Sequence, residues 1–212
     1  MPKAADPAVR VALLEAAARI IAEEGPSRLT LRRLANEVGA STMVVYTHFG
    51  SMPEVRREVR REGFARLGAH LGAVEATGDP VADYFVLGWA YFRNGTQNPN
   101  LYRAMFLDGP IDAEDVGMGI ETFEQCVSAV RRCIEAGRFD AQEPVVIATQ
   151  LWALLHGIVS LVLAHFLPED QALQCLGDGG INLFKAYGDD PRAVGRSFAR
   201  GRERMLASLE SA

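Results

Sequence analysis

The sequence predicts an all-α fold, in which a three-helix N-terminal domain with a helix-turn-helix precedes a longer helical domain. Two observations support this prediction. Apolar residues recur at steps of three and four along most of the 212 residues, and no segment keeps the alternating pattern of a strand. Glycine and proline residues end the successive helical patterns. We expect the first domain to cover residues 1–52 and the second to cover residues 53–212.

Residues 29–50 have the spacing of a helix-turn-helix. Two helices that cross closely need a small residue at the crossing, which Ala35 supplies. Four residues later Gly39 suits a turn with positive φ, and six residues further on Val45 can return to the core. An ordinary pair of packed helices is the alternative interpretation of this stretch.

The second helix of this motif should point several side chains outward, as a helix in the major groove of DNA does. The expected contacts to phosphates or base edges come from this helix and from the starts of both helices: Thr30, Arg32, Ser41, Thr42, Met43, Val44, Tyr46, Thr47 and His48. The hydroxyls of Thr30 and Ser41 can also cap their helices. The Arg32 guanidinium suits either a guanine edge or a phosphate.

Residues 10–52 resemble the DNA-binding domain of TetR/AcrR-type transcriptional regulators. The resemblance rests on an amphipathic helix that ends in EEG, the run LTLRRLANEVG and an S-x-x-x-x-Y-x-HF pattern. It implies a homodimer that binds double-stranded operator DNA, and two-fold protein symmetry predicts a pseudo-palindromic operator. We therefore expect a ligand-responsive regulator, most simply a repressor, that a small apolar effector releases from DNA.

One position departs from the family pattern. After HFGS the family usually carries a lysine that resembles a phosphate contact, whereas this chain has Met52. A helical interaction protein with weak or lost DNA binding is therefore the alternative function.

The charge is unevenly divided along the chain. Residues 1–62 hold ten Lys or Arg against eight Asp or Glu, whereas the remainder holds twelve against nineteen, within a net charge of −5. This division predicts a weakly basic DNA-reading part on an acidic body. Electrostatics alone should give it only poor non-specific DNA binding.

Helices are expected over residues 9–24, 53–76, 81–97, 101–107, 113–136, 145–167, 169–187 and 191–209. In the helix over residues 53–76, charge comes early and apolarity late, which indicates an exposed half followed by a buried half. Its early arginines alternate with glutamates, which favours an ion-pair face over phosphate binding. The arginines of the helix over residues 191–209 are interpreted as a solvated face rather than a second nucleic-acid patch. Three glycines should weaken the helix over residues 169–187 unless close backbone contacts compensate.

Residues 145–167 contain no charged side chain over 23 positions, which is long enough to cross a bilayer. Several polar residues within this stretch and acidic residues on both flanks argue against a membrane span. A helix that is apolar on all sides is instead expected to be buried, with one side against its own body and the other against a second subunit.

Two motifs resemble one ligand-binding subclass of TetR-type regulators, the WHG type. Residues 152–157 match its W-x-x-x-H-G pattern, and residues 98–106 match its Pro-x-Leu-Tyr-x-x-Met-Phe segment. This resemblance implies a helical C-terminal domain for ligand binding and dimerisation. Candidate ligand-binding residues are mostly aromatic: Trp89, Phe92, Tyr102, Met105, Phe106, Phe123, Trp152 and His156. The alternative assigns half of the aromatic residues to the core and makes His156 a core histidine bonded to a backbone carbonyl.

No catalytic role is expected, because the chain has no nucleophile elbow, phosphate loop, metal-ligand pair or dinucleotide fingerprint. The three cysteines lack ligand spacing with a histidine, so we expect no metal and no cofactor. Their small number and the absence of a leader-like N-terminus predict a cytoplasmic protein.

Overall fold

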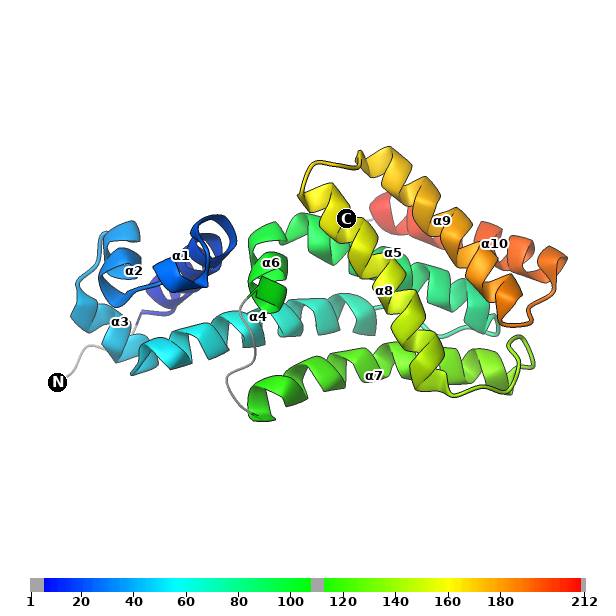
Figure 1. Ribbon diagram of the computed structural model, residues 1–212, viewed down its shortest axis with the longest axis horizontal. Helices are drawn as coiled ribbons and strands as arrows, with labels where there is room; N and C mark the ends of the chain where they lie inside the picture. Colours follow the sequence, from blue (N-terminus) through cyan, green and yellow to red (C-terminus); the bar gives the residue numbers. More distant parts are fainter. Residues whose placement is uncertain (1–5, 108–112, 211–212) are drawn as a thin grey trace. The chain divides into compact units, whose positions relative to one another are not determined.

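The computed structural model describes residues 6–107 and 113–210, and within them the fold is all-α, as the sequence predicted (Figure 1). The helices are α1 (Pro7–Glu24), α2 (Leu31–Glu37), α3 (Thr42–Phe49), α4 (Met52–Gly72), α5 (Pro80–Gln97), α6 (Pro99–Leu107), α7 (Ala113–Glu135), α8 (Pro144–Leu163), α9 (Glu169–Ala186) and α10 (Pro191–Glu210), with a 3₁₀ turn over Pro26–Arg28. Each expected helix is found, and most of the ends lie within a few residues of the expected positions.

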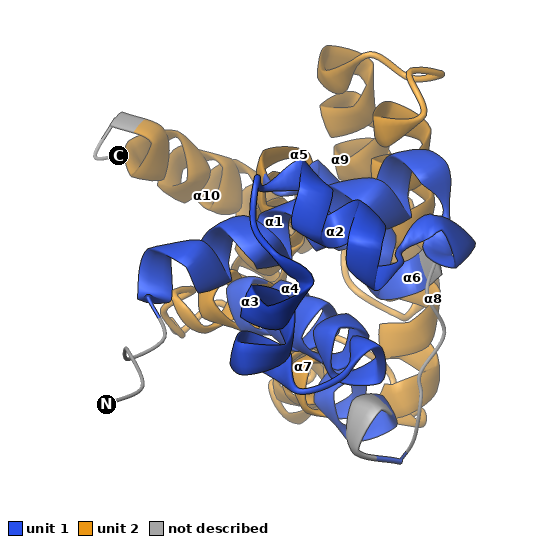
Figure 2. Ribbon diagram, turned by 90° about the vertical axis from the view of Figure 1, so that its left-hand side faces the viewer, with its two compact units in different colours: residues 1–66, 98–120 blue, residues 67–97, 121–212 orange. Residues whose placement is uncertain are grey.

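The chain divides into two compact units, coloured separately in Figure 2. Unit 1 consists of residues 1–66 and 98–120, and unit 2 consists of residues 67–97 and 121–212. The chain therefore passes from one unit to the other three times: within α4, between α5 and α6, and within α7. The expected division into a DNA-binding domain and an effector domain at residue 52 stays a prediction.

The core of unit 1 contains more than the three N-terminal helices. Buried apolar residues of α1, α2 and α3 pack together with Val55 and Val59 of α4 and with Leu101 and Ala104 of α6. Helix α6 packs directly against α1. A helix that lies about 50 residues beyond the helix-turn-helix thus completes its core.

The first half of α4 is not exposed, contrary to the expectation from its charge. Val55 and Val59, one helical turn apart, face the core of unit 1 and are fully buried. Arg60 is also buried, and its guanidinium donates a hydrogen bond of 2.5 Å to the Met105 carbonyl oxygen. The expected ion pairs are present, because Arg57 bonds to Glu54 and Arg61 pairs with Glu58. The apolar stripe, rather than the mean charge, decides which part of the helix is buried.

Helix α9 remains helical through its glycine cluster because each glycine accepts a close neighbour. A Cβ on Gly177 would lie 2.9 Å from the Phe198 ring, and one on Gly180 would lie 3.1 Å from the Phe85 ring. A Cβ on Gly179 would lie 3.0 Å from the Leu154 side chain. The contacts to α5, α8 and α10 thus offset the low helix propensity of glycine, as the sequence required.

Two carboxylates near the start of α5 join distant parts of unit 2. Asp83 accepts hydrogen bonds from the Thr77 backbone N–H, the Thr77 hydroxyl, Arg132 and Arg204 at 2.6–2.8 Å. Asp79 binds Arg200 and Arg138. The interpretation of the α10 arginines as a solvated face is therefore wrong for Arg204, which is 29% exposed, whereas Arg200 stays 53% exposed while it pairs with Asp79.

Helix α8 is long and apolar enough to cross a membrane by length and composition alone. In unit 2 it packs against α5 and α9. Only 39% of its most apolar 18-residue window is buried within this chain, so the burial on every side that its composition predicted is not reached by one chain. Val145, Val146 and Leu161 stay exposed.

Candidate nucleic-acid interface and effector site

The helix-turn-helix has the geometry that its spacing predicted. Ala35 and Val45 are buried, and Gly39 has a φ of 65°, in the left-handed region. The Thr30 hydroxyl caps α2 by accepting a hydrogen bond from the Arg33 N–H at 3.3 Å. Ser41 occupies the capping position of α3 without a side-chain hydrogen bond to the helix.

The outer face of α3 is exposed. Met43 is 68% exposed and Tyr46 is 48% exposed, large values for an apolar and an aromatic side chain. Thr42 and Thr47 are also exposed, and the Thr47 hydroxyl donates to the Met43 carbonyl oxygen at 2.8 Å. Val44 and His48 are half-buried, so less of their surface is accessible to a DNA groove than that of the other predicted residues of α3.

Most cations of the helix-turn-helix region are neutralised by carboxylates. Arg33 binds Glu24 at 2.7 Å and also binds Glu37, and Arg10 pairs with Glu58. Arg32, by contrast, is exposed and has no acidic partner among the residues that the structure describes. It is therefore a cation available to a phosphate or a base edge.

The residue that departs from the family pattern does not face solvent freely. Met52 is half-buried against the core of unit 1 at the first position of α4. The Ser51 hydroxyl beside it accepts a hydrogen bond from the Glu54 N–H at 3.2 Å. Met52 thus contributes packing at a position where the family pattern places a cation.

Three aromatic side chains of unit 2 form a hydrogen-bonded group between α5 and α8. The Trp152 Nε1–H donates to the Tyr91 hydroxyl at 3.0 Å, and this hydroxyl lies 3.3 Å from the His156 Nδ1. Trp152 also packs edge-on against Phe123 of α7, with ring centroids 6.0 Å apart. Burial lowers the pKa of His156, which favours the neutral imidazole. We call Tyr91, Phe123, Trp152 and His156 the aromatic network.

The eight predicted ligand-binding residues divide between the two units. Trp152, His156 and Phe123 meet in the aromatic network, and Trp89 stacks on Phe92 with centroids 5.8 Å apart. The other three lie in unit 1, where Tyr102 and Met105 are buried and Tyr102 packs edge-on against Phe106. Their role in binding stays a prediction. Tyr91 is not among these eight residues, because it lies two residues from Trp89 and so does not share its helical face.

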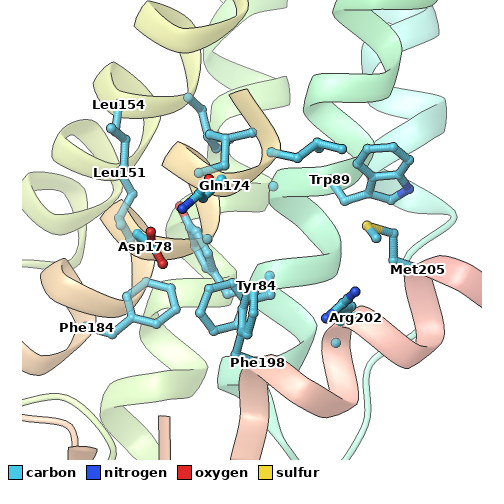
Figure 3. Close-up of a pocket in the computed structure, with 18 of the residues that line it drawn as sticks. Tyr84, Trp89, Leu151, Leu154, Gln174, Asp178, Phe184, Phe198, Arg202 and Met205 are labelled. Carbon is cyan, nitrogen blue, oxygen red and sulfur yellow. The ribbon is translucent and has the colours of Figure 1, made fainter. Parts of the chain in front are cut away.

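Unit 2 contains a cavity of about 550 Å³ between α5, α8, α9 and α10 (Figure 3). Of the predicted ligand-binding residues, only Trp89 lines it. Its wall is mostly apolar and includes Phe85, Leu151, Leu154, Leu173, Leu176, Phe198, Met205 and Leu206. We call this space the α5–α10 cavity.

No group of three potential metal ligands occurs in the part of the chain that the structure describes. Cys126 and Cys133 are buried, and burial raises the pKa of each thiol to about 12, so both remain protonated at neutral pH.

Residues 13–59 match the family described as bacterial regulatory proteins, tetR family, and residues 84–175 match the family described as tetracyclin repressor-like, C-terminal domain. The chain belongs to the TetR family of transcriptional regulators. It is 26% identical over 163 residues to an HTH-type transcriptional regulator of Mycobacterium tuberculosis, covering 76% of this chain and 72% of the relative.

Solved structures have the same fold as this TetR-family chain. A protein from Rhodococcus sp. RHA1 aligns with a TM-score of 0.73 at 23% identity, covering 89% of this chain and all of that one. The TetR-family regulator PfmR from Thermus thermophilus aligns with a TM-score of 0.69 at 19% identity, covering 82% of this chain and 97% of that one. These structures share the fold, and the family match makes the chain a transcriptional regulator with an N-terminal DNA-binding domain of the helix-turn-helix type.

Proposed function

We propose that this TetR-family protein is a cytoplasmic, ligand-responsive repressor that binds a pseudo-palindromic operator as a homodimer. The observation that carries the proposal is the surface of the helix-turn-helix. Met43 and Tyr46 are exposed on α3, and Arg32 lies at the start of α2 without an acidic partner in the described residues. Such side chains can enter a major groove and contact base edges or phosphates. The arginines that pair with carboxylates are less available for these contacts.

The uncovered face of α8 supports the homodimer. Val146, Ala153, Gly157 and Leu161 are all exposed and recur at helical spacing along it. Thr149 and Gln150 interrupt this stripe, but its exposed apolar side chains are costly in water, and a second copy can cover them by two-fold symmetry. Two copies then present two helix-turn-helix motifs to the two halves of an operator.

The effector is proposed to bind at the aromatic network of unit 2. A small apolar compound gains affinity from aromatic walls and orientation from a few polar atoms, here those of Trp152, Tyr91 and His156. Helices α4 and α7 each run from one unit into the other. A displacement of either helix can therefore change the separation of the two DNA-reading motifs, with a coupling of about 1 to 3 kcal/mol.

A gel-shift experiment with the intergenic DNA upstream of the gene tests the DNA-binding proposal. Retardation should depend on the dimer and should weaken steeply with salt. If no palindromic fragment is retarded even at low salt, the proposed function is wrong.

Replacing Arg32 with alanine should weaken operator binding by about 1 to 3 kcal/mol if the guanidinium reads a base, and specificity should relax at one position of the site. The measurement is a titration of the wild-type operator and of single-base variants. Arg131→Ala, which removes an exposed arginine of α7, is the control and should leave binding unchanged. An equal loss on every sequence would instead make Arg32 a phosphate contact.

Replacing Gly157 with leucine should weaken the dimer by roughly tenfold in Kd, because the side chain would enter the proposed helix crossing. Sedimentation over a range of protein concentrations measures this change. Gly195→Leu is a matched control, because a Cβ added at either glycine meets no described atom within 4 Å. If the two variants associated equally, α8 would not form the dimer interface at Gly157.

The alternative function is a helical interaction protein with weak or lost DNA binding. Met52 and the neutralised arginines of unit 1 favour it. A titration with non-specific DNA at several salt concentrations separates the two functions. A DNA-binding protein should bind at low salt and lose affinity as the salt concentration rises, whereas a protein without this function should not bind at any salt concentration.

A further inference from the structure

The α5–α10 cavity has one charged position in an otherwise apolar wall of α10. The residues of α10 that line it are Phe198, Gly201, Arg202, Met205 and Leu206. Their spacing of three and four residues makes them a single helical face. Arg202 lies in the middle of this face, between a phenylalanine and a methionine, where a residue that serves only packing would be apolar.

The three neighbouring arginines of α10 differ in their partners. Arg200 and Arg204 point to the other side of the helix and are held by Asp79 and Asp83. Arg202 is exposed and has no ion-pair partner among the described residues. Its methylene stem can lie along apolar surface while its guanidinium stays at the mouth of the cavity. The cavity therefore has a cationic group that forms no ion pair with the residues that the structure describes.

The other charged residue that lines the cavity is Asp178 of α9. Asp178 lies on the outer, exposed stripe of α9 together with Gln171, Gln174 and Asn182. Figure 3 places Asp178 on the α9 side and Arg202 on the α10 side of the cavity. Both side chains are exposed, but Asp178 lies within a polar stripe of α9, whereas Arg202 is the one charged residue among the α10 residues that line the cavity.

We propose that the α5–α10 cavity binds an elongated apolar molecule that carries a single anionic group. The apolar body lies between Leu151 and Leu154 of α8 and Phe198 of α10, and the anion is held by Arg202. The volume of about 550 Å³ is within the usual range for a small-molecule site. A guanidinium at its mouth favours a carboxylate through charge-assisted hydrogen bonds. This site is separate from the proposed effector site, because Trp152 and His156 do not line the cavity.

The test is calorimetric titration of the free, full-length protein with decanoate, 1-decanol and decylammonium, all below their critical micelle concentrations. Decanoate should bind about tenfold more tightly than decanol, and decylammonium should bind more weakly than either. Arg202→Gln should lower the decanoate affinity to that of decanol and leave decanol unchanged. Asp178→Asn should leave the decanoate affinity intact. Equal binding of decanoate and decanol, or a decanoate affinity that survives Arg202→Gln, would overturn the proposal.

A second pair of variants tests the location. Leu206 and Leu209 of α10 are each 46% exposed, but only Leu206 lines the cavity. Leu206→Trp should weaken both decanoate and decanol by filling the cavity, whereas Leu209→Trp should weaken neither, with circular dichroism confirming that both variants fold. Trp152→Phe should leave decanoate binding unchanged. If Trp152→Phe lowered the decanoate affinity and Leu206→Trp did not, the ligand would lie in the aromatic network and the proposal would be overturned. Because no DNA is present, this result is independent of the gel-shift outcome.

Discussion

Replacing Asp83 with alanine is expected to lower the free energy of unfolding by about 3 to 5 kcal/mol. The carboxylate is buried and accepts hydrogen bonds from Thr77, Arg132 and Arg204, which lie before α5, on α7 and on α10. Its removal leaves these donors without their shared acceptor. Urea unfolding at a fixed protein concentration measures the loss, and Glu203→Gln on the exposed side of α10 is the control. A change below about 1 kcal/mol would show that solvent replaces the carboxylate.

The same carboxylate should make stability depend on pH. Burial opposes the ionisation of Asp83, but the hydrogen bonds from Thr77, Arg132 and Arg204 outweigh it, so the pKa of Asp83 is lowered. The unfolded chain then takes up this proton at a higher pH than the folded chain does. The contribution is fully present above the unfolded pKa of about 4 and is lost as the pH falls through the folded pKa. Below pH 5, unfolding free energy should fall less steeply in Asp83→Asn than in the wild type.

Replacing Phe184 with alanine should cost about 3 to 5 kcal/mol, because the large side chain is only 1% exposed and leaves a void. Its ring centroid lies 4.9 Å from that of Phe85, 5.1 Å from that of Phe139 and 5.7 Å from that of Tyr84, whose ring is nearly perpendicular to it. These contacts join α9 to α5 and to the segment after α7. The measurement is the unfolding midpoint in urea with an unchanged slope.

Phe166→Ala is the matched control, since Phe166 is 81% exposed in the segment after α8. Its loss should change the stability of one chain by no more than about 0.5 kcal/mol. If both phenylalanine variants lost the same stability, the aromatic cluster around Phe184 would not be the source of the effect.

Local patterns of the sequence were sufficient for the helices and the helix-turn-helix. Gly39 and Ala35 have the roles that their spacing predicted, because a turn and a helix crossing depend on residues close together in the chain. The exposure of α4 was predicted wrongly, because mean charge hides a stripe of two valines. The partners of Arg200 and Arg204 lie about 120 residues away in the sequence, and no local pattern predicts an ion pair between residues so far apart.

The candidate sites, like the fold, were predictable only where they depend on residues close together in the chain. The motif of Trp152 and His156 drew attention to α8, but the Tyr91 hydroxyl that joins them comes from another helix. The α5–α10 cavity was missed altogether, because four helices contribute its wall and none of them shows a hollow in its own sequence. The only sequence signal for the cavity was the helical face formed by Phe198, Arg202 and Leu206. Without knowledge of the neighbouring helices, this face cannot be distinguished from that of an ordinary amphipathic helix.

The place of α6 in the core of unit 1 limits how this regulator can be recombined with its relatives. Leu101 and Ala104 complete a core whose other members come from the first 59 residues. A chimaera that exchanges only the contiguous N-terminal block would set a foreign α1 against the original α6, and the two surfaces were never selected for each other. New operator specificity is therefore more safely obtained by changing the outer residues of α3 than by transplanting the whole head.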